Sequence, residues 1–353
     1  AAQAAPRAAA RAAARADAGA AARRVDFALA HAAAPIPSRL DQLPMSAPAN
    51  GTRRLGPAVN EPVKSYAPGS PERAELKARL AAMEKERPDI PLIIGGQEIR
   101  TGDVMQAVSP HKHKHVTATW HRARTKDVTA AIAAARKAQK EWAAWRWEDR
   151  AAVLLRAADL LATKYRATIN AATMLGQSKT IFQSEIDAAC EMIDFWRFNV
   201  QFAGEIMADQ PVNSPGMLNS TDYRGLEGFV YAVTPFNFTA IGGNLSSAPA
   251  LMGNTVVWKP ASSSMLSAYY VMRLFEAAGL PPGVINFVPG SAGPITDTVL
   301  ASPNLAGIHF TGSTEVFNSM WKTVGANMSN YKSYPRLVGE TGGKDFIVAH
   351  PSA

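Results

Sequence analysis

The sequence has a single cysteine, Cys190, and lacks the long apolar run that a membrane helix needs. One cysteine excludes an internal disulfide framework and is typical of proteins from reducing compartments. No uninterrupted apolar stretch approaches the roughly 18 residues of a membrane span, so we expect no membrane partner. The G-x-G-x-x-G fingerprint of many dinucleotide-binding folds is also missing. A nucleotide site, if there is one, must therefore be recognised by other residues.

Acidic residues are few relative to basic ones, with 29 Asp and Glu against 37 Lys and Arg and a net charge of +8. Half of that excess lies in residues 1–24, where five arginines accompany one acid, Asp17. The rest of the chain has no cluster of Lys and Arg interleaved with aromatic residues, which is the pattern of a nucleic-acid-binding surface. We therefore expect no nucleic-acid partner.

Residues 1–56 form a low-complexity leader rich in alanine, arginine and proline. Arg7, Arg11 and Arg15 would share one face of a helix, and an acid-poor, arginine-bearing N-terminus is typical of mitochondrial transit peptides. This pattern predicts a location in the mitochondrial matrix. Low-complexity disorder is the alternative, because residues 1–24 contain no serine and almost no bulky apolar residue. Prolines recur as far as Pro68, so we expect an extended, poorly ordered chain up to residue 69.

Beyond this point the apolar residues recur at helical spacing. Ser70 followed by Pro71 suits a helix start, and Thr125 is a second candidate cap. The spacing predicts helices over about 71–88, 125–142, 149–165 and 184–205. The short apolar run 91–94, closed by two glycines, predicts a hairpin. We expect the aromatic residues of the last helix to pack in the core: Phe195, Trp196, Phe198 and Phe202.

After residue 225 apolar strands alternate with helical stretches. The strands are Phe229–Val233, Thr255–Trp258, Val284–Val288 and Gly307–Phe310. The helix Met265–Ala278 stops at Gly279, a residue that commonly terminates helices. Strands and helices that alternate at this pitch predict an α/β fold with a doubly wound parallel sheet.

Polar clusters follow the strands of this predicted sheet. They are Thr234–Phe238, Trp258–Pro260, Phe310–Thr314 and Gly339–Lys344. Taken alone each cluster is weak evidence, since a Gly-Ser-Thr before a helix is commonly just a cap. Ligands of doubly wound sheets bind outside the carboxyl ends of the strands. The four clusters together therefore predict one shared site.

The order of these motifs resembles the aldehyde dehydrogenase superfamily over roughly residues 57–353. The similarity is greatest to the branch that oxidises glutamate semialdehyde in proline breakdown. The supporting blocks are Asn60–Val63, Gly69–Arg73, Ser184–Ala189 and Tyr223–Pro260. Thr239 and Phe317 stand where most relatives carry proline and glycine, and both departures are typical of this branch.

The resemblance implies an organisation in two parts after the leader. Residues 57–344 would form N-terminal helices and a Rossmann-like NAD-binding domain. Residues 345–353 would begin a catalytic domain, most of which would lie beyond the chain. The cofactor implied is NAD, and the substrate is a small-molecule aldehyde.

The resemblance also implies roles for particular residues. Asn237 would donate its amide to the oxyanion formed when a thiolate attacks the aldehyde. Glu340 would be the general base that activates water. Lys259 would hold the adenosine ribose of NAD. Further cofactor contacts would come from Thr234, Pro235, Phe236, Gly312, Ser313 and Thr314, the last three at a helix start that suits a pyrophosphate.

Considered without the resemblance, these residues allow other interpretations. Asn237 could simply close a turn, and Lys259 could be a solvated surface lysine. Glu340 could be a strand-end acid paired with a lysine. The structure must decide between these alternatives.

The family's nucleophile is a cysteine in a Gly-rich loop, which would lie beyond Ala353. Cys190 is not a substitute, because it lies in a predicted helix, where cysteine is usually a small buried apolar residue. The resemblance thus implies a complete enzyme that oxidises glutamate semialdehyde to glutamate through a cysteine-bound thiohemiacetal and thioester. This part alone would be inactive. The alternatives are another semialdehyde dehydrogenase, or a non-catalytic product that binds nucleotide or pairs with a full-length subunit.

Two further features concern assembly and metals. The resemblance implies a homo-oligomer, with Leu218–Arg224 as a possible edge strand between subunits. His111, His113 and His115 could bind zinc, but lysines alternate with them and no matching Cys/His set exists. We predict a solvated loop there and no metal.

Overall fold

The computed structural model describes residues 56–343 and 346–353. The predicted leader, apart from its last residue, lies outside these residues, and so does the hypothesis of a transit peptide. Lys344 and Asp345 also lie outside them. Among the described helices, none combines the length and the apolar character that crossing a bilayer would demand.

The main sheet has seven strands in the order β10-β9-β6-β7-β8-β2-β3. Their bounds are β2 Leu92–Ile94, β3 Gln97–Ile99, β6 Phe229–Val233, β7 Thr255–Lys259, β8 Ile285–Phe287, β9 Leu305–Gly312 and β10 Arg336–Thr341. Strands β10, β9, β6, β7 and β8 run parallel, which confirms the predicted α/β fold with a parallel sheet. The hairpin β2–β3 is antiparallel, as predicted, and its turn uses Gly95 and Gly96 at φ of 58° and 77°.

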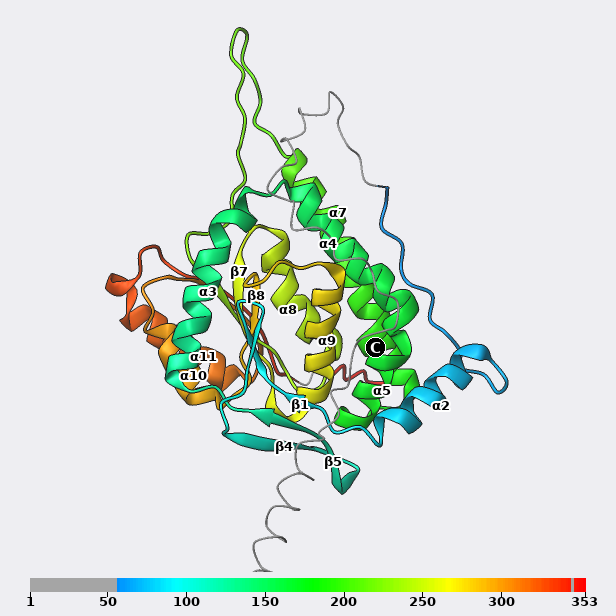
Figure 1. Cartoon of the computed structure of the whole chain (residues 1–353). Coiled ribbons are helices and arrows are strands. Elements are labelled where there is room, and N and C mark those ends of the chain that lie inside the picture. Colours follow the sequence, from blue (N-terminus) through cyan, green and yellow to red (C-terminus); the bar gives the residue numbers. More distant parts are fainter. Residues whose placement is uncertain (1–55, 344–345) are drawn as a thin grey trace, which may run out of the picture. The chain divides into compact units, whose positions relative to one another are not determined.

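Helices cover both faces of this sheet, and Figure 1 shows β7 and β8 between α3 on one side and α8 and α9 on the other. On the first face lie α3 (Thr125–Ala144), α10 (Ala292–Leu300) and α11 (Thr314–Ala326). On the second lie α8 (Thr239–Leu251) and α9 (Met265–Ala278). Strands covered on both faces are apolar throughout, and every residue of β7 is buried. This burial on both faces explains why the apolar sequence runs predicted the strands.

The ends of these helices test the predicted caps. Helix α9 ends where predicted, and Gly279 adopts φ 89°. Thr125 is the first residue of α3 and Arg124 precedes it as the N-cap, so the prediction of Thr125 as cap is wrong by one residue. The Asp127 carboxylate accepts the Arg124 backbone amide at 2.9 Å and so satisfies one free donor of the helix start.

A layer of further helices packs against α8 and α9. It contains α2 (Pro71–Met83), α4 (Trp147–Leu160), α5 (Arg166–Gln177), α6 (Ile181–Ser184) and α7 (Glu191–Ala208). The π-helical turns Leu161–Tyr165 and Glu185–Cys190 join α4 to α5 and α6 to α7, so the helices predicted over 149–165 and 184–205 extend further. The helix predicted over 71–88 is shorter and ends at Met83. Trp196 is fully buried, as expected, whereas Phe202 is 49% exposed and was wrongly assigned to the core.

A second, three-stranded sheet has the order β1-β5-β4. Its strands are β1 Asp89–Ile90, β4 Val104–Ser109 and β5 Lys112–His121. The three histidines at 111, 113 and 115 lie at its hairpin turn and on β5, so the prediction of a solvated loop is wrong. His113, near the hairpin turn, is exposed, whereas His115, further along β5, is buried.

The segment of residues 56–66, which we call the strap, is extended as predicted but is held in place by many contacts. The Ala58 amide donates to Gln201 Oε1 at 2.7 Å, and the Glu61 amide donates to Asp194 Oδ1 at 2.7 Å. The prediction of a poorly ordered chain up to residue 69 is therefore wrong for this segment. Its polar groups bind to side chains of α7, and the local sequence pattern does not predict these contacts.

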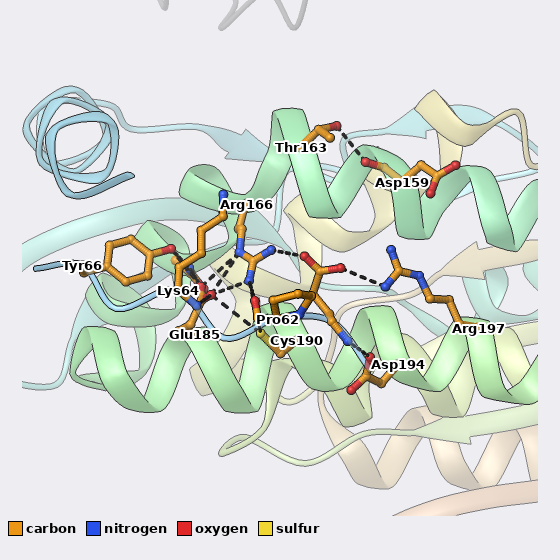
Figure 2. Close-up of polar contacts among 12 residues, drawn as sticks. Pro62, Lys64, Tyr66, Asp159, Thr163, Arg166, Glu185, Cys190, Asp194 and Arg197 are labelled. Atoms are coloured by element: carbon orange, nitrogen blue, oxygen red, sulfur yellow. Dashed lines mark hydrogen bonds and ion pairs between the residues drawn. The ribbon is translucent and has the colours of Figure 1, made fainter. Parts of the chain in front are cut away.

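Arg166 is the centre of the contacts that hold the strap (Figure 2). Its guanidinium pairs with Glu61 of the strap and with Glu185 of the π-helical turn, and it donates to Pro62 O at 2.8 Å. The side chains of Arg166 and Glu185 are only 3% and 1% exposed. Burial acts to raise the pKa of Glu185, but hydrogen bonds from Arg166, the Lys64 amide and Tyr66 outweigh it and lower that pKa. Glu185 is therefore a buried carboxylate.

Replacing Arg166 tests how strongly this network stabilises the fold. Arg166→Met leaves the buried Glu185 carboxylate without its cation and leaves Glu61 only the ion pair with Arg197, so we expect a loss of about 3–5 kcal/mol in the free energy of unfolding. The matched control is Arg197→Met, since Arg197 makes one ion pair, with Glu61, and is 25% exposed. This control should lose about 1 kcal/mol or less. Urea denaturation measures both, and equal losses would contradict the central role of Arg166.

Candidate active site

The polar clusters that follow the strands lie along one edge of the sheet. In the parallel register, Val233 at the end of β6 is level with Lys259 of β7 and with Phe310 of β9. On the other side of β9, Glu340 of β10 is level with Thr311. Parallel strands present their carboxyl ends at the same edge, so the four clusters converge on one region. The predicted shared site is geometrically consistent.

The loop of residues 234–238 leaves β6 at this edge and carries Asn237. The first residue of the loop, Thr234, is held by two hydrogen bonds to β7. Its amide donates to Lys259 O at 3.3 Å, and its Oγ1 accepts from Trp258 Nε1 at 3.0 Å. Asn237 and Phe236 are exposed, and the Asn237 side chain has no hydrogen-bond partner among the residues that the structure describes. An Asn that merely closed a turn would bond the neighbouring backbone. This amide is instead free to meet a ligand.

Lys259 is the least expected residue of the edge, because it is buried, with 8% of its surface exposed. Burial lowers the pKa of its ammonium group. Within residues 56–343 and 346–353, the ammonium has no hydrogen-bond or ion-pair partner. A solvated surface lysine is therefore excluded. A buried cation without a partner suits a ligand that supplies hydroxyl or anionic oxygens.

The start of α11 completes the edge beside β9. Ser313 is the N-cap, and its hydroxyl accepts the Val316 amide at 3.3 Å. Gly312 and the exposed Ser313 and Thr314 leave the first backbone amides of this helix open to an anion. Gly312 has no room for a side chain, since a Cβ there would lie 2.6 Å from the ring of Phe310.

Glu340 lies on the outermost strand, β10, and is exposed. Its carboxylate accepts a hydrogen bond from Thr311 Oγ1 at 3.4 Å. It has no ion-pair partner among the described residues, which do not include Lys344. An aromatic stack holds the strand: Phe317 stacks on Phe310 with centroids 5.4 Å apart and lies against Gly339, where a Cβ would overlap its ring. The carboxylate is thus held at the edge and open to a water molecule.

Glu191, at the start of α7, is a half-buried carboxyl near this edge that the sequence analysis missed. Burial raises the pKa of Glu191 to about 7, and the charges of Asp187 and Glu340 act in the same direction. Lys179 opposes this shift. The charge of Glu340 thus acts on Glu191, although the two residues belong to different elements, β10 and α7. The only sequence signal was its position just after the block Ser184–Ala189.

Cys190 is buried in the π-helical turn before Glu191, which confirms that it is a buried helical residue. Burial, followed by the charge of Glu185, raises the pKa of the Cys190 thiol to about 12. A reactive cysteine needs a lowered pKa, so this thiol is no nucleophile. The described residues also contain no group of three or more His, Cys, Asp or Glu that could hold a metal ion.

Two open pockets lie elsewhere in the molecule. A cavity of about 340 Å³ separates the strap from α4 and α7, and its lining includes Val59, Leu155 and Val200. A smaller one of about 230 Å³ lies at the end of α5, beside Lys179. We rank the strand edge above both pockets, because it gathers an amide and an ammonium that have no partner among the described residues and an exposed carboxylate.

Comparison with known proteins gives a consistent result. The model of the aldehyde dehydrogenase family matches residues 98–353. The chain is 52% identical over 304 residues to the delta-1-pyrroline-5-carboxylate dehydrogenase of Agaricus bisporus, covering 86% of this chain and 56% of that protein. For the mitochondrial enzyme of that name from Homo sapiens, the identity is 49% over 295 residues, with coverages of 84% and 52%. The chain thus spans about half the length of these relatives.

Solved structures agree with these relatives. The crystal structure of the Mycobacterium tuberculosis Delta-pyrroline-5-carboxylate dehydrogenase bound with NAD has a TM-score of 0.84 and 55% identity to this chain, covering 86% of it and 57% of that chain. The 1-pyrroline-5-carboxylate dehydrogenase from Thermus with bound NAD has a TM-score of 0.77 and 31% identity, with coverages of 83% and 57%. The similarity therefore extends over most of the chain in three dimensions.

The pKa of Glu191 makes a prediction about stability. A carboxyl whose pKa is about 7 in the folded state and 4.5 by itself binds more protons when folded, so stability falls as the pH rises between these values. Glu191→Gln removes the charge, and its melting temperature should fall less than that of the wild type between pH 5 and pH 8. Thermal unfolding at four pH values measures this, with the exposed Glu75→Gln as control. Parallel profiles for wild type and Glu191→Gln would refute the assignment.

Proposed function

The chain belongs to the aldehyde dehydrogenase family, and we propose that it is the NAD-binding part of an enzyme that oxidises L-glutamate γ-semialdehyde to L-glutamate. The semialdehyde is the open form of pyrroline-5-carboxylate. The observation that carries the proposal is the single strand edge, where the structure, as far as it describes the chain, shows an amide and a buried ammonium without partners beside an exposed carboxylate. The names of the most similar relatives supply the substrate.

The residues of the edge fit NAD. The Lys259 ammonium would donate to the adenosine ribose hydroxyls, which would give this buried cation the partners it lacks. The amides at the start of α11, after Gly312 and Ser313, would meet the pyrophosphate. Thr234, Pro235, Phe236 and Thr314 border the same region and would complete the contacts. Bound NAD supplies the hydride acceptor for the reaction.

Asn237 and Glu340 would serve the two halves of the reaction. The Asn237 amide would donate to the oxyanion that forms when a cysteine thiolate adds to the aldehyde, and such a donor contributes about 3–4 kcal/mol to catalysis. The Glu340 carboxylate would accept a proton from the water that releases the acid. We propose that the cysteine belongs to a Gly-rich loop supplied from outside residues 1–353.

We propose further that the whole enzyme is a homo-oligomer, and that residues 209–224 belong to its interface. This arm has no assigned strand, and side-chain amides hold its two sides together: Thr221 N donates to Gln210 Oε1 at 2.8 Å and Asn219 N to Asn213 Oδ1 at 2.6 Å. Val212 and Leu218 on it are 91% and 88% exposed. Exposed apolar side chains of this size favour burial against a partner.

A second copy of the subunit is therefore the expected partner of the arm. In the whole enzyme, the double substitution of serine for Val212 and Leu218 should shift the mass measured by light scattering from that of an oligomer to that of a monomer. The solvent-exposed pair Lys137 and Glu75, replaced by serine, should leave the mass unchanged. A monomeric wild type would refute the proposal.

We also propose the mitochondrial matrix as the location. Several relatives carry the word mitochondrial in their names, and residues 1–24 have the composition of an import signal. Import of a reporter protein fused to residues 1–56 into isolated mitochondria tests this, and a reporter left outside would refute it.

The function itself is tested with the polypeptide that joins this chain to the family's cysteine-bearing part. NADH absorbance should rise with pyrroline-5-carboxylate and rise much more slowly with succinate semialdehyde. Lys259→Met should raise the dissociation constant for NAD roughly tenfold to hundredfold, since hydrogen bonds from a charged donor contribute about 1.5–3 kcal/mol. The exposed Lys137→Met, on α3, is the matched control. A preference for the other aldehyde, or equal NAD affinity of the two variants, would contradict the assignment.

A further inference from the structure

The Asn237 side chain makes no hydrogen bond to any residue that the structure describes, yet the residues on either side of it are both anchored by the end of α5. On one side, Gln177 Nε2 donates to the carbonyl oxygen of Phe236 at 2.7 Å. On the other, the ammonium of Lys179 lies 3.8 Å from the centroid of the Phe238 ring. The same short segment of chain therefore fixes the backbone before and after Asn237.

The Gln177 amide is held in one orientation by a buried chain of hydroxyl groups. Thr239, the first residue of α8, donates its hydroxyl to Gln177 Oε1 at 2.7 Å. Thr239 has one hydroxyl proton, so in its 2.8 Å contact with Thr173 the Thr173 hydroxyl is the donor. Thr173 and Thr239 are 0% and 4% exposed. The bonds run in one direction, from Thr173 through Thr239 and Gln177 to the carbonyl of Phe236.

Lys179 is held independently of this chain. Its ammonium pairs with Asp187 Oδ2 at 2.6 Å, and its side chain is 12% exposed. Ser178 between the two anchors adopts the left-handed conformation, with φ 57° and ψ 32°, which ends α5. Because the helix ends there, Gln177 and Lys179 reach opposite sides of the loop. A partly buried cation over an aromatic face is a favourable contact, worth more as solvent is excluded.

We propose that Thr173, Thr239, Gln177 and Lys179 are positioning residues, which hold the Asn237 amide in place for the oxyanion. The proposal rests on the proposed function in one respect, that Asn237 is the oxyanion donor. A donor on an exposed loop stabilises a transition state only if its position is fixed in advance. Thr239, the first residue of α8, supplies the hydroxyl that orients Gln177. Proline is also favoured at this position of a helix, but it has no hydroxyl and could not donate this bond.

The test compares Thr239→Val, which keeps the shape but loses the hydroxyl, with Thr239→Ser, which keeps the hydroxyl. In the complete enzyme, Thr239→Val should lower kcat roughly tenfold to hundredfold, since small misplacements of catalytic groups have effects of this size. Thr239→Ser should restore kcat to within about threefold of the wild type. The dissociation constant for NAD should not change in either variant. Gln177→Met is a second disruption, at a side chain only half buried, in case Thr239→Val impairs folding.

A double substitution separates positioning from general stability. If the hydroxyl chain acts through Asn237, Thr239→Val should cause no further loss of kcat in an Asn237→Ala background. An equal loss in both backgrounds, or an unchanged kcat in Thr239→Val and Gln177→Met, would overturn the proposal.

A crystal structure of the chain with Thr239→Val gives a readout that does not depend on activity. The loop 236–238 should shift or lose order relative to Thr239→Ser, and an identical loop in both would overturn the proposal. If the wild-type enzyme oxidises no semialdehyde, the proposed function fails, while this comparison still decides whether the hydroxyl chain positions the loop.

Discussion

The parallel register of β10, β9, β6 and β7 is the constraint on which the site depends. Hydrogen bonding between parallel strands fixes which residues are level, so Val233, Lys259, Thr311 and Glu340 end up on one edge although more than one hundred positions separate the first from the last. The crossover helices α8, α9, α10 and α11 bring each strand back in the same direction. Every polar cluster then leaves the sheet on the same side.

Burial gives the residues of this edge their different chemical properties. Lys259 is a buried cation to which no described residue is paired, and Glu191 is a carboxyl with a pKa of about 7. Glu185 is more deeply buried, but Arg166 and three further donors keep it ionised. Burial acts to raise the pKa of both carboxyl groups, and the net shifts are opposite because hydrogen-bond donors surround Glu185. Cys190, between them in the chain, is next to Glu185 and is kept as a neutral thiol.

Two layers of support lie behind the edge. The strap and the network of Arg166 fix the π-helical turn from which α7 and Glu191 follow (Figure 2). The end of α5 fixes the loop of Asn237 from behind, and the stack of Phe310 and Phe317 holds the strand of Glu340. Function on this edge therefore depends on residues that no ligand would touch.

The sequence by itself determined the strands of the parallel sheet and the polar motifs that follow them. Strands such as β6 and β7 are buried on both faces and so consist of apolar residues, and α9 ends at a glycine because only a left-handed residue continues the chain there. The motifs after the strands indicated Asn237, Lys259, Ser313 and Glu340 before any contact was known. Only the tertiary structure decided that Lys259 is buried and that the strap is ordered. It also revealed Glu191 and the hydroxyl chain behind Asn237. Each of these features depends on partners more than sixty positions away in the chain or on desolvation by other elements. Local sequence patterns predict neither.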